Sequence, residues 1–258
     1  MTAMRIDLNS DMGESYGAWT MGDDEALMPY ITSASIACGW HAGDPGLMRK
    51  TIRLAKQHGV RIGAHPGYPD LLGFGRRPMQ LSPEEAKDYL LYQIGALAAF
   101  AQAEGSRLQH VKPHGALYNA AARDRSLSRA IAEAVAEADP GLILVGPPDS
   151  ELVRAGQDAG LKVAREGFGD RAYKEDGSLV SRRIPGALVT DPDAAGDQVL
   201  MLLEGKVRAV TGRMIEIAVD TICLHGDTPG VQAVAQRLRD RLAEAGVQAV
   251  SLEELLGG

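Results

Sequence analysis

The chain has 258 residues, of which 45% are hydrophobic and 24% are charged, and its formal net charge is -7. These values are ordinary for a globular protein and allow one large α/β domain or two small ones. The negative charge argues against binding to nucleic acid or anionic membranes through bulk charge. No apolar run reaches the roughly 18 residues that a membrane-spanning helix needs.

The first residues and the cysteines indicate the compartment. The segment 1–5 leads directly into a predicted strand, with no apolar signal-peptide region. The two cysteines, Cys38 and Cys223, lack CxxC spacing. We therefore expect a cytoplasmic protein without a disulfide framework.

The first predicted strand, residues 4–9, alternates between apolar and polar side chains. Its polar face carries Asp7, Asn9 and then Asp11, and Glu14 follows in the loop. Alternate residues of a strand point to opposite faces. A strand with acids on one face fits a barrel interior that becomes polar toward its mouth.

The run 36–45 combines a strand end, a glycine-lined turn and a helix start. His41 lies in the turn, and Asp44 followed by Pro45 is typical of a helix N-cap and its first position. A capping role is favoured for Asp44 over a catalytic one. The histidine is thus presented at the carboxyl end of a strand, where parallel α/β folds place their chemistry.

The rest of the chain continues to alternate strands and helices. We expect further strands at 33–38, 61–65, 110–112, 142–145, 162–165 and 220–224, and a hairpin formed by 207–210 and 214–219. Helices are expected at 45–58, 82–105, 117–138, 149–159, 191–205 and 251–256, with another capped by Thr228 and Pro229; 66–78 and 171–190 are long loops.

This order of elements predicts the fold class. About seven strands, most of them followed by a helix, argue for a parallel sheet. That number of units in one chain favours a (β/α) barrel over an open sheet, as a single domain spanning 1–258. The sequence contains no GxGxxG after the first strand and no GxxxxGK[ST], so the nucleotide-fold fingerprints are missing.

Histidines accumulate where the predicted strands end. Four of the six, His41, His65, His114 and His225, lie there, each beside glycine or proline. Core histidines would be scattered, so this grouping predicts an active site. His110 opens its strand and is expected at the other end. On a strand, its separation from His114 spans about 13 Å, too far for one metal ion.

Such a group of residues supports two kinds of chemistry. Histidine and aspartate either bind a divalent metal, with Asp11, His41 and His65 as the candidate ligands, or act as general acid and base. Lys112 fits an anion or oxyanion partner, and a salt bridge to Asp7 or Asp11 is an equally favoured alternative.

Two loops add candidate binding residues. The loop 73–77 offers backbone N–H groups with Arg76 and Arg77, which suit a phosphate or carboxylate, although a solvated arginine pair is as well supported. Arg171 and Tyr173 are candidates for a lid. The predicted catalytic set is Asp11, His41, His65, Lys112, His114 and His225. The predicted substrate- or nucleotide-binding set is Asn9, Glu14, Arg76, Arg77, Asp170, Arg171, Tyr173 and Asp227.

Five runs, in order along essentially the whole chain, resemble a known family. They are 6–14 (IDLNSDMGE), 37–44 (ACGWHAGD), 63–70 (GAHPGYPD), 111–118 (VKPHGALY) and 221–227 (TICLHGD). They resemble the LamB/YcsF family of lactam-utilisation proteins, whose members serve as the A subunit of prokaryotic 5-oxoprolinase. The resemblance implies a (β/α) barrel similar to that of the polysaccharide deacetylases.

The resemblance also implies a reaction and partners. The reaction is the ATP-dependent opening of 5-oxo-L-proline to L-glutamate, with release of ADP and phosphate and with Mg²⁺ accompanying ATP. The implied partners are 5-oxoprolinase subunits B and C. Because a phosphate-cradling motif is missing, ATP would bind through loop N–H groups, the Arg76–Arg77 loop or a partner chain. We therefore expect the chain alone to be inactive.

Two other functions stay open at this point. One is a stand-alone, metal-dependent amide or N-acetyl hydrolase, which the deacetylase-like barrel would suit. The other is a non-catalytic carrier or regulatory module that binds a small acid. The carrier function is the weaker of the two, because a binding site seldom needs so many converging titratable groups.

Overall fold

A closed barrel of parallel strands forms the centre of the molecule. The computed structural model describes residues 4–226 and 230–257. Its barrel strands are β1 (Arg5–Met12), β2 (Ser33–Ala37), β3 (Arg61–His65), β4 (Leu108–Val111), β5 (Ile143–Gly146), β6 (Lys162–Phe168) and β9 (Thr221–Cys223). Each pairs in parallel with the next, and β9 closes the ring by pairing with both β6 and β1. The predicted (β/α) barrel is confirmed.

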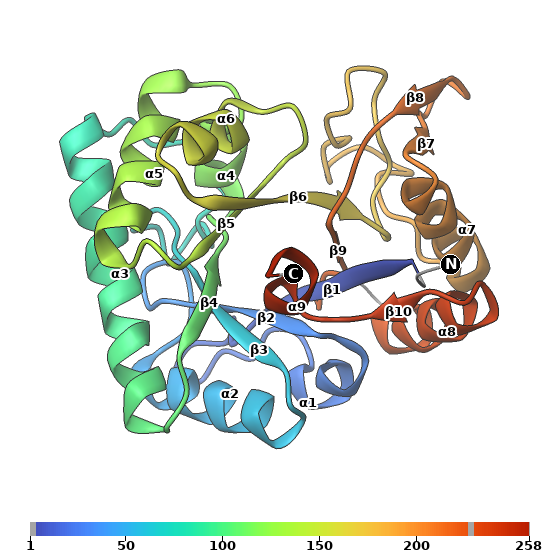
Figure 1. The fold of residues 1–258 in the computed structure, drawn as a ribbon. Helices are drawn as coiled ribbons and strands as arrows, with labels where there is room; N and C mark the ends of the chain where they lie inside the picture. The colour runs from blue at the N-terminus through green and yellow to red at the C-terminus, as the bar shows by residue number, and fades with distance from the viewer. Residues whose placement is uncertain (1–3, 227–229, 258) are drawn as a thin grey trace.

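Helices surround the strands on the outside (Figure 1). They are α1 (Asp24–Leu27), α2 (Pro45–Gln57), α3 (Pro83–Ala103), α4 (Gly115–Ala121), α5 (Arg125–Ala138), α6 (Glu151–Asp158), α7 (Pro192–Leu203), α8 (Val231–Glu244) and α9 (Leu252–Leu256), with a short 3-10 turn, η1 (Met28–Tyr30). None of the helices within 4–226 and 230–257 is long and apolar enough to cross a membrane.

Side-chain caps define where several helices begin. Asp44 accepts hydrogen bonds from the N–H groups of Gly46 and Leu47, which confirms the capping interpretation. Ser82 and Glu85 form the reciprocal capping box at the start of α3. The predicted cap at Thr228 and Pro229 lies outside the described residues.

Several element boundaries differ from the prediction. The region 117–138 is two helices, because Asp124 accepts from the N–H groups of the second one and restarts it. The strand β6 runs on to Phe168, because it pairs with β9 from Glu166 to Phe168. The hairpin of β7 (Lys206–Arg208) and β8 (Met214–Glu216) is confirmed, whereas β10 (Gln248–Ala249), which pairs with the start of β1, was not predicted.

The barrel interior contains polar side chains near the amino ends and the middle of its strands. The Asp7 carboxylate, on the predicted polar face of β1, accepts from the hydroxyls of Ser33 and Thr221 at 2.6 and 2.5 Å. The register of β3 against β4 shifts after Ile62, and this irregularity leaves both Gln109 and His110 buried. His110 is therefore the third residue of β4 and not its first, and its Nε2 lies 3.1 Å from the Ser35 hydroxyl.

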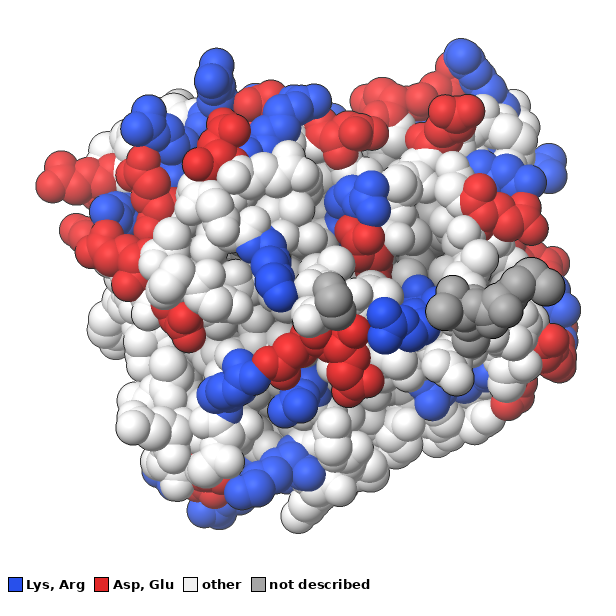
Figure 2. Space-filling view, viewed as in Figure 1, with Lys and Arg blue, Asp and Glu red and all other residues white. Residues whose placement is uncertain are grey.

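The opposite end of the barrel is closed by α9. Leu252 packs against the inward-facing residues Ile143, Val145 and Ala164, and the N–H of Glu253 donates to the Gln109 side chain. This helix lies over the front end of the barrel in Figure 1, and Figure 2 shows positive and negative side chains interspersed on the same face. The closed end leaves the carboxyl ends of the strands as the accessible mouth.

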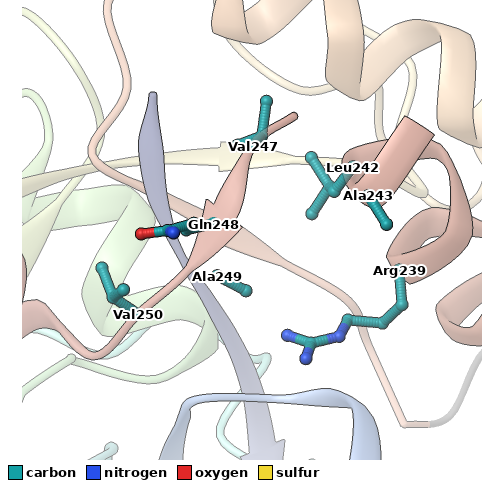
Figure 3. A pocket seen from close by; sticks show the side chains of 7 residues that line it. All are labelled: Arg239, Leu242, Ala243, Val247, Gln248, Ala249 and Val250. Atoms are coloured by element: carbon teal, nitrogen blue, oxygen red, sulfur yellow. The ribbon is translucent and has the colours of Figure 1, made fainter. Parts of the chain in front are cut away.

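A surface hollow of about 390 Å³ lies between α8 and β10 (Figure 3). Its lining consists of Arg239, Leu242, Ala243 and residues 247–250. Because β10 pairs with Arg5 and Ile6 at the start of β1, this hollow lies at the amino ends of the strands. It contains none of the residues predicted to be catalytic.

Burial of Asp7 predicts a pH-dependent stability. Desolvation raises the pKa of its carboxyl group from 3.8 to about 6, although hydroxyl donors partly oppose the shift. Between these two values the unfolded chain loses a proton that the folded chain keeps, so stability falls as the pH rises, by up to about 3 kcal/mol. The variant Asp7→Asn has no carboxyl group to ionise at this position, and so it should not show this pH-dependent loss of stability.

We therefore expect the parent chain to lose unfolding free energy relative to Asp7→Asn as the pH rises from about 4 to about 7. Urea unfolding at several pH values measures it. The exposed Asp158→Asn is the control and should follow the parent. Parallel pH curves for Asp7→Asn and the parent would show that Asp7 ionises normally.

Candidate active site

The carboxyl ends of the strands bring the predicted reactive residues to one place. Asp11 ends the polar face of β1, His65 is the last residue of β3, and Lys112 follows β4 directly. The remaining residues come from the loops after these and neighbouring strands: Glu14, His41, His114, Asp170 and His225. Barrel closure makes all these strand ends neighbours.

Three histidines and one glutamate are in mutual contact, and we call Glu14, His41, His65 and His114 the imidazole cluster. The Glu14 Oε1 atom lies 3.3 Å from His41 Nε2 and 3.2 Å from His114 Nδ1. The facing nitrogens of His65 (Nε2) and His114 (Nδ1) are 2.9 Å apart. The rings of His41 and His114 stack, with centroids 3.7 Å apart.

The loop after β3 covers this cluster. The Phe74 ring meets the edges of the His41 and His114 rings at centroid separations of 5.7 and 5.1 Å. Gly75 lies so close to both histidines that a Cβ there would come within 2.8 Å of each side chain. Asp70 holds the loop by accepting from the Gly73 N–H and from the Arg77 guanidinium. The loop therefore shields the three imidazoles.

Lys112 lies at the centre of a second group, the lysine network of Asn9, Asp11, Lys112, Tyr118 and Glu166. Its buried ammonium lies 2.6 Å from Asp11 Oδ1 and 2.9 Å from both Glu166 Oε1 and Asn9 Oδ1. Tyr118 donates its hydroxyl to Glu166 Oε2 at 2.7 Å. The salt-bridge alternative for Lys112 is therefore correct, with Asp11 and Glu166 as partners, and the ammonium is already engaged by three groups.

Burial and charge set the protonation states. Burial alone would raise the pKa of Asp11, but His65 and Lys112 outweigh it and hold that pKa well below its usual range. Burial alone would likewise lower the pKa of Lys112, but the surrounding anionic groups, Asp11 first, raise it. Burial lowers the pKa of His41 to about 3 and also lowers that of His114. These shifts favour an ionised Asp11, a charged Lys112 and neutral imidazoles at His41 and His114.

His225 forms a separate dyad with Asp170. Its Nδ1 lies 2.9 Å from Asp170 Oδ1, and its ring stacks on Phe168 with centroids 5.5 Å apart. A nitrogen of His225, an oxygen of Asp11 and the Cys223 sulfur all lie within 4.8 Å of one another. Asp11 therefore connects the dyad to His65 and the imidazole cluster, because its Oδ2 atom lies 3.4 Å from His65 Nε2.

The sequence model of the LamB/YcsF family matches residues 6–257. The chain therefore belongs to the LamB/YcsF family. A relative from Pyrococcus abyssi, named as the A subunit of 5-oxoprolinase, is 54% identical over 255 residues, 98% of this chain and all of the relative. The solved structure of a lactam utilization protein from Thermus thermophilus is 51% identical, covers 96% of this chain and all of its own, and has a TM-score of 0.91.

A more distant structure has the same architecture. The T48 deacetylase in complex with its substrate is 16% identical to this chain, covers all of it and 92% of its own chain, and has a TM-score of 0.53. This level of similarity shows a shared fold and confirms the expected deacetylase-like barrel. The chemistry of this LamB/YcsF chain must be argued from its own strand ends.

The predicted binding residues lie in different places. Arg77 pairs with Asp70, and the Arg76 guanidinium lies 4.8 Å from the centre of the Phe74 ring. Arg171 is 6% exposed, and one of its N–H groups donates to a backbone carbonyl. Tyr173 is 1% exposed, and its hydroxyl accepts from the Phe168 N–H. Both of these side chains are therefore buried, and Asp227 lies outside the described residues.

Two members of the lysine network were not selected from the sequence. Glu166 was expected to follow a strand that ended one residue earlier, and Tyr118 to lie within a helix. The signal for Glu166 was its position two residues after Ala164 on the same face of β6. No local pattern indicates that the Tyr118 hydroxyl reaches Glu166, because the contact joins residues 48 apart.

The lysine network predicts a large stability effect. Replacing Lys112 with methionine leaves the buried Asp11 and Glu166 carboxylates without their cation, so we expect the free energy of unfolding to fall by about 3–5 kcal/mol. Lys50→Met is the matched control, because its ion pair with Glu25 is two-thirds exposed on both sides. The control should unfold nearly as the parent does.

Urea unfolding of the three chains tests this expectation. A further variant, Lys112→Met combined with Glu166→Gln, removes one of the stranded charges and should recover part of the loss. Equal stability of Lys112→Met and the parent chain would contradict the role given to this ammonium.

Proposed function

We propose that this chain is the A subunit of an ATP-dependent 5-oxoprolinase, which opens 5-oxo-L-proline to L-glutamate and releases ADP and phosphate. The observation that carries the proposal is the full-length match to the A subunit of 5-oxoprolinase from Pyrococcus abyssi. In support, the matching strand-end motifs meet in one buried site of carboxylates, imidazoles and a lysine.

The reaction explains the need for ATP. The lactam is an unstrained amide and a poor electrophile. Transfer of a phosphoryl group to its oxygen makes the ring carbon open to attack by water. This water must lose a proton, and the ring nitrogen must gain one as the C–N bond breaks, which leaves an acyl phosphate. A second water then hydrolyses the acyl phosphate to glutamate and phosphate.

His225 fits the proton-transfer role best. Asp170 holds its Nδ1, which orients the ring and leaves the other nitrogen for substrate or water. The imidazole is 13% exposed, and so lies at the edge of the site, whereas His41 and His65 are almost fully buried. Lys112, held by Asp11 and Glu166, helps to lower the pKa of Asp11 and contributes positive charge within the site.

Arginines offer the anion-binding groups. The Nε of Arg171 has no hydrogen-bond partner within the described residues. Burial lowers the pKa of Arg171, and the nearby charges of Arg182 and Arg76 lower it further. Positive side chains beside the Asp170–His225 dyad suit the carboxylate of 5-oxoproline or a phosphate of ATP. The place of ATP stays a proposal.

The rim offers a surface for partner proteins, which we propose to be 5-oxoprolinase subunits B and C. In the loop after β3, Leu72 is 85% exposed, and Arg76 and Arg77 are also exposed. Phe74, in contrast, packs on the imidazoles, and Arg171 and Tyr173 are buried. The docking role therefore falls to the exposed arginines of this loop.

The first prediction of this proposal is dependence on partners. The purified chain with ATP, Mg²⁺ and 5-oxoproline should form no glutamate, and adding the two partner proteins should give stoichiometric ADP and glutamate. Replacing Arg76 and Arg77 by alanine should reduce this activity, whereas Arg129→Ala on α5, 80% exposed, should not.

Turnover by the isolated chain at the rate of the mixture would overturn the dependence on partners. Turnover of an amide or N-acetyl substrate without ATP would instead favour the alternative function, a metal-dependent hydrolase acting alone. The imidazole cluster is the feature that keeps this alternative open.

The second prediction concerns His225. In the assembled enzyme, His225→Ala should lower kcat by about 10²–10⁴-fold, the usual loss when a general acid–base group is removed. Removing the imidazole also takes a partner from the buried Asp170 carboxylate, so circular dichroism and thermal unfolding must show that the variant is folded at the assay temperature. His58→Ala, which removes an exposed imidazole at the end of α2, is the control. Unchanged turnover in His225→Ala would place the proton transfer elsewhere.

A further inference from the structure

The hydrogen bonds of two imidazoles determine where their lone pairs point. His65 Nδ1 lies 2.7 Å from the Lys112 carbonyl oxygen, and His114 Nε2 lies 2.8 Å from the Phe74 carbonyl oxygen. A carbonyl oxygen only accepts, so both of these nitrogens carry hydrogen. In neutral rings the lone pairs are then on His65 Nε2 and His114 Nδ1, which face each other at 2.9 Å.

Two lone pairs at this separation require a cation between or beside them. The third donor is anionic, because Glu14 Oε1 lies 3.2 Å from His114 Nδ1 and 3.9 Å from His65 Nε2. A proton is shared by only two of these atoms, whereas a metal ion can be bound by the lone pairs of all three. The arrangement therefore fits a metal ion better than a shared proton.

The spacing also fits the size of a first-row metal. Bonds of about 2.0–2.1 Å in tetrahedral geometry separate neighbouring donor atoms by about 3.3 Å. The three separations, 2.9, 3.2 and 3.9 Å, bracket this value. The carbonyl contacts made by the far nitrogens of His65 and His114 are the outer hydrogen bonds that metal-binding histidines usually make.

His41 does not fit as a ligand beside His114. Their rings are parallel within 7° at 3.7 Å, so one ion cannot lie in both ring planes. His41 Nδ1 also has no hydrogen-bond partner within the described residues, and so it lacks the outer contact of a typical metal ligand. Its Nε2 faces Glu14 Oε1 at 3.3 Å, which suits a residue that positions the carboxylate.

Asp11, the other candidate ligand from the sequence, is shared between Lys112 and His65: Oδ1 lies 2.6 Å from the Lys112 ammonium, and Oδ2 lies 3.4 Å from His65 Nε2. The donor atoms that lie within 4.8 Å of one another around His65 and His114 come instead from Glu14 and His41. Among the predicted ligands Asp11, His41 and His65, only His65 therefore keeps its place, and Glu14 and His114 take the other two.

We propose that Glu14, His65 and His114 bind one divalent first-row transition metal ion, with a fourth position open to water or substrate. Imidazole and carboxylate donors select such ions, and three protein ligands with an open position are typical of catalytic sites. Bound there, the ion supplies Lewis-acid chemistry beside Asp11 and the Asp170–His225 dyad. The proposal rests on contacts within this chain and does not depend on ATP or on partner proteins.

Cobalt titration of the full chain, after treatment with a chelator and dialysis, tests the proposal without an activity assay. We expect one Co²⁺ per chain, with the strong visible d–d absorption of a four- or five-coordinate ion, and we expect Zn²⁺ to displace it. Bound Zn²⁺ should also raise the unfolding temperature. His65→Ala and His114→Ala should abolish the absorption.

Two matched variants separate ligands from neighbours. His58→Ala removes an exposed imidazole and should bind Co²⁺ as the parent chain does. His41→Ala should retain the absorption with about 10–100-fold weaker binding, the usual effect of an outer partner. Circular dichroism checks folding, and His114→Gln replaces any alanine variant that does not fold.

The proposal is overturned if the parent chain binds no Co²⁺ at the imidazole cluster, which leaves a shared proton as the cation. It is also overturned if His114→Ala keeps the full spectrum, or if His41→Ala loses it while His65→Ala does not. These outcomes are independent of the 5-oxoprolinase assay. An active complex that binds no ion would overturn the metal proposal alone, and a chain that binds the ion in an inactive complex would overturn the proposed function alone.

Discussion

The buried ammonium of Lys112 is the constraint on which the site depends. A buried cation costs several kcal/mol of desolvation, which only nearby anions and acceptors offset. Asp11 from β1 and Glu166 from β6 both approach the ammonium to within 3 Å, and Asn9 adds an acceptor. One side chain thereby ties together three strands of the barrel and pairs with two carboxylates in its interior.

Asp11 connects the two halves of the site. One of its oxygens pairs with Lys112, and the other lies 3.4 Å from His65. On its other side lies His225, which Asp170 orients. A cluster of lone pairs, suited to a metal ion, is thus joined through one carboxylate to a dyad suited to proton transfer. This division of roles is what a reaction needs when an electrophile must be polarised and a proton moved at the same place.

The loop after β3 has two faces with different tasks. Its inner face, with Phe74 and Gly75, packs on the imidazoles and excludes water from them. Its outer face exposes Leu72 and the arginines at 76 and 77. The pairing of Asp70 with Arg77 holds the loop in the conformation that presents these two faces. A partner that contacts the outer face would therefore also contact the cover of the site.

The sequence by itself determined the barrel and the end of the barrel that holds the site. Alternation along the chain, the Asp44 and Ser82 caps, and the histidines at strand ends are local signals, and parallel pairing places all strand ends on one rim. Only the tertiary structure decided which side chains meet: that Lys112 lies in an ion-pair network, that Glu14 contacts His41 and His114 while Asp11 lies between His65 and Lys112, and that Tyr173 is buried. These contacts join residues far apart in the chain, and they depend on barrel closure, rotamers and the cost of burying charge, none of which a local pattern contains.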